Sequence, residues 1–302
     1  MTQTPSTRTP SQIPGADPAG GGRLRHLIRT RISEHPALYL PVARRKYPGT
    51  SHLLFARKTY PGTSPEVVSS ETELVIDGYT RCATTFAVYA FQLAQDRPVR
   101  VAHHLHAPAQ LIVAAKMGIP VLALIREPEE TILSQLIREP GISLRGALVA
   151  YARFYSCLMP YRSRMVVGQF EEVTRSFGPV IRKLNDHFGT SFTEFEHNEA
   201  NVRACLDLVK ERPTPIPEWS TALGKFESGL ITRNDLRRAR ERFAHQPKSL
   251  GSRDVWLPSA ERSQLKDRLR EQWSHPHLTA LRARTQAAYE TFVIGVGAGA
   301  PS

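Results

Sequence analysis

The chain has 302 residues, enough for one α/β domain with appendages, and its 41% apolar content is ordinary for a globular protein. Its 40 Lys and Arg against 28 Asp and Glu give a formal net charge of +12, which favours an anionic partner: a nucleotide, nucleic acid, membrane surface or sulfated polymer. Cys82, Cys157 and Cys205 are far apart and form no Cys-x-x-Cys pair, so we expect no disulfide framework or zinc site, and a reducing cytoplasm fits. No run of about 18 apolar residues occurs, so we expect no transmembrane helix.

The N-terminal part divides into a tail and a basic segment. Residues 1–22 are rich in Thr, Pro, Ser and Gly, and we expect a disordered tail there. Residues 23–58 are basic and should be helical over 23–33 and 38–45, covering the core of a single domain that spans 23–295.

The central part alternates apolar, β-branched runs with helical patterns. We expect strands at 73–76, 99–102, 121–125 and 165–168, and helices at 86–95, 109–117, 128–138, 143–158 and 179–188. This alternation predicts an α/β fold with a parallel sheet and right-handed crossovers. From 199 to 295 the pattern is helical and charged, with a proline-rich loop at 213–219 and terminal helices at 259–272 and 278–292.

The loop between the first strand and helix is the most informative segment. It reads Gly78-Tyr79-Thr80-Arg81-Cys82-Ala83-Thr84-Thr85. A strand, a tight loop and a helix N-terminus can hold a phosphate, because free N–H groups and the positive end of the helix dipole point at the anion. The loop lacks the Gly-Lys-Ser/Thr of a Walker A motif. The alternative is an ordinary strand-to-helix turn.

A second candidate anion site follows the strand at 121–125. Arg126 stands at its carboxyl end, where open α/β sheets bind ligands, and Ser134 follows eight residues later. A phosphate dianion suits a guanidinium fork and a neutral hydroxyl. Alternatively, Arg126 pairs with a carboxylate and Ser134 is a surface residue. Arg138 adds positive charge one turn on, or pairs with Glu130.

A histidine turn lies between the second strand and the next helix, with His103, His104 and His106 before Pro108. Histidine suits a general base, since its ordinary pKa lies near neutral pH. His106 and His104 are both candidates, and a structural turn is the alternative. Three histidines also suggest a metal, but no nearby carboxylate or cysteine completes a ligand set, so we expect none.

These segments, over about 73–190, resemble bacterial-type sulfotransferases that use 3′-phosphoadenosine 5′-phosphosulfate. The resemblance implies a P-loop-type α/β fold, that nucleotide as donor, no metal, and in-line sulfuryl transfer to a hydroxyl. It implies that the loop residues Arg81, Cys82, Ala83, Thr84 and Thr85 bind the 5′-phosphosulfate. It also implies that Arg126 and Ser134 bind the 3′-phosphate. The base would be His106, with His104 beside it.

The chain departs from the family at several of these positions. Arg81 replaces a lysine, Cys82 a serine and Ala83 a glycine, and His104 stands where a lysine is usual. If Ala83 needs a positive φ, it costs about 1 kcal/mol. A reactive Cys82 is an alternative role for that residue. The family's later Arg-Lys-Gly segment is missing, and Lys248 or Arg253 are its candidate substitutes.

We therefore expect a cytoplasmic sulfotransferase whose acceptor is a small molecule, a glycan or a lipid. Three alternatives stay open. A degenerate relative would bind the nucleotide without catalysis. A P-loop kinase would need a magnesium-binding hydroxyl after a loop lysine and a strand-end aspartate, which we do not identify. A basic nucleic-acid-binding protein would need a reader motif, which we do not find.

Overall fold

A computed structural model describes residues 21–46, 66–212, 216–243 and 260–295. Its centre is a four-stranded sheet in the order β2-β1-β3-β4, and every neighbouring pair is parallel. The strands are β1 (Leu74–Gly78), β2 (Val101–His103), β3 (Val121–Ile125) and β4 (Val166–Gln169). The predicted α/β class and parallel sheet are confirmed.

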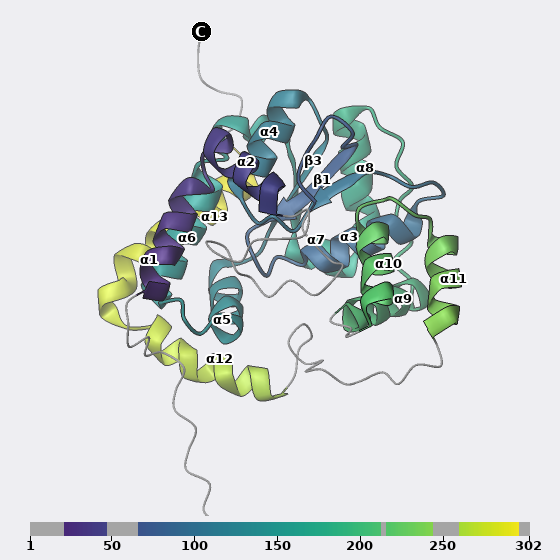
Figure 1. Ribbon diagram of the computed structural model, residues 1–302. Helices are drawn as coiled ribbons and strands as arrows, with labels where there is room; N and C mark the ends of the chain where they lie inside the picture. The colour runs from purple at the N-terminus through teal and green to yellow at the C-terminus, as the bar shows by residue number, and fades with distance from the viewer. Residues whose placement is uncertain (1–20, 47–65, 213–215, 244–259, 296–302) are drawn as a thin grey trace, which may run out of the picture.

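Helices cover both faces of this sheet, so its strands are mainly apolar, with Asp77 in β1, His103 in β2 and Gln169 in β4 as the polar residues. All five residues of β3 are fully buried, as expected for a strand enclosed by two helical layers. In Figure 1, α3 and α8 lie to the right of the strands, and α4, α6 and α13 lie to the left. The helices nearest the sheet are α3 (Thr84–Ala94), α4 (Pro108–Met117), α5 (Pro128–Arg138), α6 (Leu144–Ser156), α7 (Phe170–Arg175), α8 (Phe177–Phe188) and α13 (Thr279–Ile294).

The remaining elements are helical and surround this core. They are α1 (Gly21–Ile32), α2 (Pro36–Lys46), the 3₁₀ turns η1 (Met159–Arg164) and η3 (Pro276–Leu278), α9 (Glu199–Glu211), α10 (Pro217–Glu227), α11 (Arg233–Phe243) and α12 (Ala260–Trp273). The predicted loop at 213–219 is wrong where the structure describes it, because Pro217 is the first residue of α10, a position that needs no N–H donor. Residues 213–215 lie outside the described residues.

The two N-terminal helices form the expected cover. Helix α1 begins at Gly21, inside the predicted tail, and residues 1–20 lie outside the described part of the chain. Helix α1 packs on α6 and α2 packs on α4. Glu34, in the turn between them, pairs with Arg153 of α6, whose Nε donates to Glu34 Oε1 at 2.6 Å. This ion pair fixes the cover to the core.

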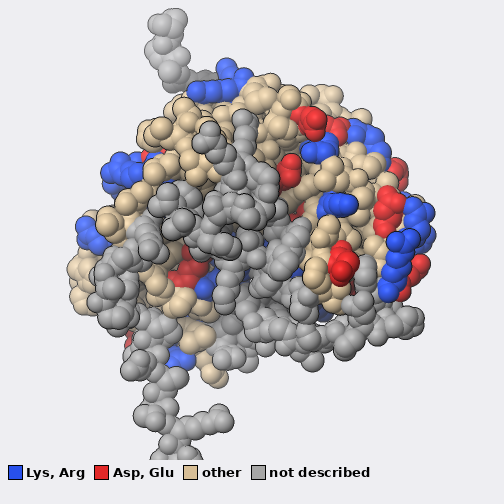
Figure 2. Space-filling view, in the orientation of Figure 1, with Lys and Arg blue, Asp and Glu red and all other residues tan. Residues whose placement is uncertain are grey.

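Charged side chains on the opposite flank are paired with one another. Figure 2 shows blue and red atoms side by side at the right edge, over α11. There Arg238 pairs with Asp235, and Arg240 pairs with Glu211 of α9. Arg233 also pairs with Asp96, so three of the five arginines of α11 have an acidic partner among the described residues.

Gly78 allows β1 and β3 to approach closely at the carboxyl edge of the sheet. A Cβ at this position would lie 2.1 Å from the carbonyl oxygen of Leu124, a main-chain atom that cannot turn aside. The loop that follows β1 can therefore begin here only if residue 78 has no side chain.

Gly78→Ala should therefore lower the free energy of unfolding by about 3 kcal/mol, because the strands must separate to admit the methyl group. Gly141→Ala is the matched control, since a Cβ there meets nothing within 4 Å. Urea denaturation of the two variants measures the difference, and equal stabilities would show that the sheet edge adapts without cost.

Candidate functional site

The loop after β1 leads into a helix N-terminus without a capping side chain. Ala83 is the N-cap residue of α3, with φ 65°, and its side chain makes no capping hydrogen bond. The first turn of α3 contains no acidic residue. The positive φ is the conformation in which an alanine costs about 1 kcal/mol relative to a glycine. The N–H groups of this turn are thus presented without a competing side-chain acceptor.

Arg81 connects this loop to the segment that follows β3. Its Nε donates a hydrogen bond to Ser134 Oγ at 3.0 Å, although the two residues are 53 positions apart. Ser134 lies in α5 and is almost fully buried. Two candidate anion-binding segments therefore meet at the carboxyl edge of the sheet.

Arg126 follows the last residue of β3. One nitrogen of its guanidinium group is hydrogen-bonded, and another is buried without a partner among the described residues. Its Nη2 donates to Glu130 Oε2 at 3.3 Å, which is the carboxylate pairing considered from sequence, and its guanidinium stacks 3.9 Å from the ring of Phe170. Its Nε is buried and has no hydrogen-bond partner within the described residues. A buried donor of this kind costs about 1–3 kcal/mol unless an acceptor reaches it.

Helix α12 adds cations around Glu130 that sequence reasoning missed. Lys266 donates to Glu130 Oε2, and Arg270 donates to Glu130 Oε1 at 2.8 Å. Burial raises the pKa of Glu130, but Lys266, Arg126 and Arg270 together hold it below its usual range. The candidate substitutes Lys248 and Arg253 lie outside the described residues. Pairing across 140 positions leaves no local sequence signal.

The two threonines of the loop differ in their surroundings. Thr84 Oγ1 is buried and has no partner in the part of the chain that the structure describes. Thr85 Oγ1 lies 2.9 Å from His104 Nε2. His104 is itself buried and contacts His103, so it supports the threonine and does not line the pocket described below.

Cys82 contributes to the structure of the loop, since its thiol lies 3.8 Å from the carbonyl oxygen of Thr80. Its thiol is fully buried, lies 3.6 Å from the Tyr155 hydroxyl, and has its pKa raised to about 11 by burial. A thiol that stays protonated at neutral pH is a poor nucleophile. The geometry therefore argues against the reactive-cysteine alternative.

His106 is oriented by Asp77, which sequence reasoning also missed. His106 Nδ1 lies 2.9 Å from the carbonyl oxygen of Gly78 and 3.2 Å from Asp77 Oδ1. Both neighbours are acceptors, so in the neutral ring Nδ1 carries the proton and Nε2 has the lone pair. The signal in the sequence was a single acidic residue in an otherwise apolar strand.

A pocket opens beside His106. It is lined by residues of α1 and the following turn, the loop after β1, α5 and α6, and its empty space is about 470 Å³, partly open to solvent. Its walls combine polar groups with two aromatic rings: His26, Arg29, Thr30, Ser33, Glu34, Tyr79, Thr80, His106, Pro108, Gln135, Glu139, Ala150 and Phe154. Tyr79 is fixed by its hydroxyl, which donates to Gln135 Oε1 at 2.8 Å.

Backbone strain is concentrated in these two loops. Among the described residues, four non-glycine residues have positive φ: Arg81 at 71°, Ala83 at 65°, His104 at 57° and His106 at 49°. Each costs about 1–2 kcal/mol, and such residues cluster where function fixes a geometry.

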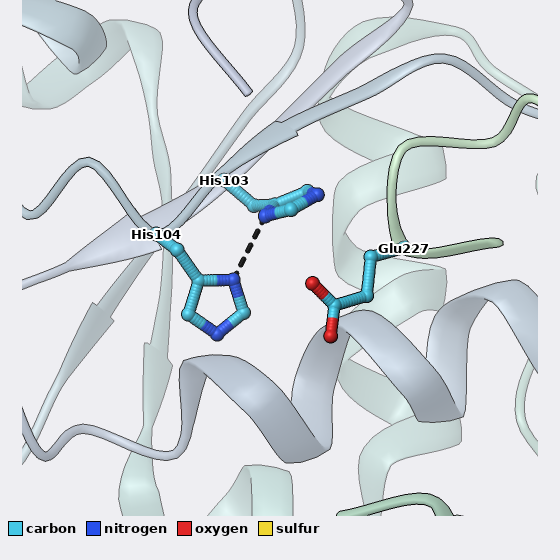
Figure 3. Close-up of side chains that lie close together, drawn as sticks. All are labelled: His103, His104 and Glu227. Carbon is cyan, nitrogen blue, oxygen red and sulfur yellow. Dashed lines mark hydrogen bonds between the residues drawn. The ribbon is translucent and has the colours of Figure 1, made fainter. Parts of the chain in front are cut away.

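His103 and His104 form a buried cluster with the carboxylate of Glu227, which is distant in the sequence. Figure 3 shows His103 and His104 facing Glu227, and one ligand-type atom of each lies within 4.8 Å of the others. The expectation that no carboxylate lies near the histidines is thus wrong in three dimensions. However, Glu227 Oε1 already accepts from Tyr89 and Arg212, both at 2.6 Å. A divalent cation would have to sit beside the Arg212 guanidinium, so the cluster fits an internal hydrogen-bond network better.

A comparison of the chain with protein-family models, curated proteins and solved structures found no match. Within the described ranges, none of the helices has the length and apolarity that crossing a membrane requires. The site is therefore interpreted from its geometry.

His103 should make stability pH-dependent. Burial lowers its pKa to about 4, against 6.5 for a free imidazole. Between these values the unfolded chain binds more protons than the folded chain, so stability is complete above pH 6.5 and falls as the pH drops toward 4, by up to about 1.4 kcal/mol per unit. His103→Gln should remove this slope in urea titrations, whereas exposed His35→Gln should retain it. Identical slopes in His103→Gln and the wild type would contradict a buried neutral imidazole.

Proposed function

We propose that the chain is a P-loop-type sulfotransferase that moves a sulfuryl group from 3′-phosphoadenosine 5′-phosphosulfate to an acceptor hydroxyl. The observation that carries the proposal is the meeting of Arg81, Ser134 and the uncapped N-terminus of α3 at the carboxyl edge of β1 and β3. Two donor groups at this edge, Arg126 Nε and Thr84 Oγ1, are buried and have no hydrogen-bond partner among the described residues. Oxygen atoms of phosphate groups are acceptors that fit such donors.

The 5′-phosphosulfate would lie against the loop. The main-chain N–H groups of Ala83, Thr84 and Thr85 point out of the helix N-terminus, and Arg81 supplies a cation beside them. In the transition state, charge develops on the oxygen between phosphorus and sulfur. Arg81 would stabilise that charge, which is catalysis by preorganised electrostatics.

The 3′-phosphate would lie at Arg126 and Ser134. Arg126 then divides its guanidinium between Glu130 and the phosphate. Lys266 and Arg270 also contact Glu130, so this carboxylate keeps partners when Arg126 turns toward the ligand. Helix α12 would thereby support the 3′-phosphate site through its contacts with Glu130.

His106 would accept the proton of the acceptor hydroxyl at Nε2. Asp77 and the Gly78 carbonyl hold Nδ1–H, so the ring is fixed in the tautomer that a base requires. The pocket beside this histidine would receive the acceptor, which the phenyl rings and polar groups of its wall would hold.

Nucleotide preference tests the donor site. The 3′,5′-bisphosphate of adenosine without magnesium should stabilise the protein more than ATP with magnesium does. At one hundred times its dissociation constant, the bisphosphate should raise the free energy of unfolding by about 2.7 kcal/mol relative to the unliganded protein. Arg126→Ala should weaken the binding free energy of this bisphosphate by about 2–3 kcal/mol, while the binding of 5′-AMP should hardly change. Arg182→Ala, an exposed arginine paired with Glu194, is the matched control.

The contrary results are distinct. Stabilisation only by ATP with magnesium would favour a kinase. Equal weakening of both nucleotides by Arg126→Ala would make that residue structural. Nucleotide binding without transfer to any phenol would indicate a degenerate relative, and salt-sensitive retention on DNA without nucleotide binding would favour a nucleic-acid-binding protein.

Alanine variants of His106 and His104 should lose different properties of the enzyme. His106→Ala should reduce sulfuryl transfer to a phenol by about 10²–10⁴-fold with bisphosphate affinity unchanged, because it removes only the base. His104→Ala should instead weaken nucleotide binding, because it frees Thr85, and transfer at saturating donor should persist. Full turnover in the His106 variant would show that the base lies elsewhere.

A further inference from the structure

Helices α1 and α2 carry most of the large apolar side chains that are exposed in the described part of the chain. Of the eight large apolar side chains that are exposed in the described residues, five lie on these two helices. Their exposed fractions are between 41% and 61%: Leu24, Leu27 and Ile28 on α1, and Leu38 and Val42 on α2. We refer to these five residues as the α1–α2 face.

The spacing makes each helix amphipathic. Leu24, Leu27 and Ile28 recur at intervals of three and four, and Leu38 and Val42 at an interval of four, so each set lies on one side of its helix. The other side of α2 is buried through Tyr39, Leu40 and Ala43. The exposed side of α2 is not polar, although this is where a surface helix normally carries its charge.

The same segment is strongly basic. Residues 21–46 contain seven Arg and Lys and one Glu, which accounts for half of the formal charge of +12 carried by the whole chain. That single Glu34 is already paired with Arg153. Arg29 and Arg31 make no ion pair with any described residue, whereas Arg238 and Arg240 of α11 each pair with a carboxylate.

We propose that the α1–α2 face docks on an anionic lipid bilayer, with its Leu, Ile and Val side chains in the interfacial region and the neighbouring Arg31, one helical turn from Leu27 and Ile28, against the headgroups. Leucine and isoleucine on one side of a helix, with arginines beside them, is the pattern of helices that lie in the membrane surface. A nucleic acid would use the arginines but leave five apolar side chains in water. The inference is independent of the proposed sulfotransferase activity.

The position of α1 gives this contact a consequence for the pocket. His26, Arg29 and Thr30 of α1 line the pocket beside His106, while Leu24, Leu27 and Ile28 belong to the exposed side. The helix that contacts the bilayer thus also forms one wall of the candidate acceptor pocket.

Vesicle co-sedimentation tests the proposal. The full chain should bind vesicles of phosphatidylglycerol and phosphatidylcholine in equal parts, and should bind phosphatidylcholine alone at least about tenfold more weakly, because the arginines need anionic headgroups. Raising the salt from about 0.1 M to about 1 M should weaken binding, since the screening length falls from about 10 Å to about 3 Å.

Variants with matched controls distinguish binding through the α1–α2 face from non-specific hydrophobic or electrostatic binding elsewhere on the surface. Leu24→Ser/Leu27→Ser/Ile28→Ser and Leu38→Ser/Val42→Ser should each reduce binding by about tenfold or more, because interfacial burial of apolar area is lost. Met117→Ser/Leu230→Ser removes side chains of similar exposure, 48% and 49%, and should bind like the wild type. Arg31→Glu should weaken binding, whereas Arg203→Glu, an exposed arginine of α9, should not. Thermal melts confirm that every variant is folded.

Each contrary result overturns the proposal. Absence of vesicle binding by the wild type excludes a membrane site. Equal binding by the α1–α2 variants and the Met117/Leu230 variant places the contact elsewhere. A wild-type dimer in light scattering that becomes monomeric in the α1–α2 variants, without vesicle binding, identifies a second copy of the chain as the occupant. Retention on RNA that these variants do not change, without vesicle binding, identifies a nucleic acid.

Discussion

A fully buried carboxylate, that of Asp77, joins the two loops of the candidate site at the end of β1. Its oxygens accept hydrogen bonds from the main-chain N–H groups of Gly78, Leu105 and His106, and from Gln110 Nε2 of α4, all at 2.9–3.0 Å. A carboxylate buried without such donors is very costly, so the donors must stay in place once the chain has folded. The loop after β1 and the histidine turn after β2 are therefore fixed relative to each other. The position of His106 beside the loop is a consequence of this network, and so is the orientation of its ring.

That network explains how the chain maintains strained backbone in the same place. The four non-glycine residues with positive φ lie in the two loops that Asp77 joins, and hydrogen bonds from the rest of the core compensate for their cost. Tyr155 contributes from the other side, since its hydroxyl donates to the carbonyl of Leu124 at 2.9 Å and lies 3.4 Å from the N–H group of Tyr79. A loop held by this many contacts needs little reorganisation when an anion arrives, which is the condition for electrostatic catalysis.

The sequence predicted what local pattern determines and missed what long-range pairing determines. The strand at 121–125 and the helix at 128–138 have the predicted bounds, because a continuous apolar run and a proline at the first helical turn are local signals. The predicted loop at 213–219 is wrong from Pro217 onward, because this proline begins α10 and the proline-rich composition around it resembles that of a loop. Asp77, Glu227 and Lys266 acquire their roles from partners 28 to 138 positions away, and no spacing rule gives such contacts. The roles of the candidate site residues stay predictions that the nucleotide and histidine experiments address.

The net charge of the chain, which first suggested an anionic partner, divides into two parts with different surroundings. At the candidate nucleotide site, Arg126, Lys266 and Arg270 are accompanied by Glu130, so the cations there are partly neutralised and held in fixed positions. That arrangement suits a small ligand with phosphates at a defined spacing. On α1, Arg31 has no acidic partner among the described residues, and it lies one helical turn from the exposed Leu27 and Ile28. Unpaired cations next to apolar side chains suit an extended anionic surface, where the position of each charge matters little. Composition alone could not separate these two sources, because the distinction depends on which arginines the fold pairs with carboxylates.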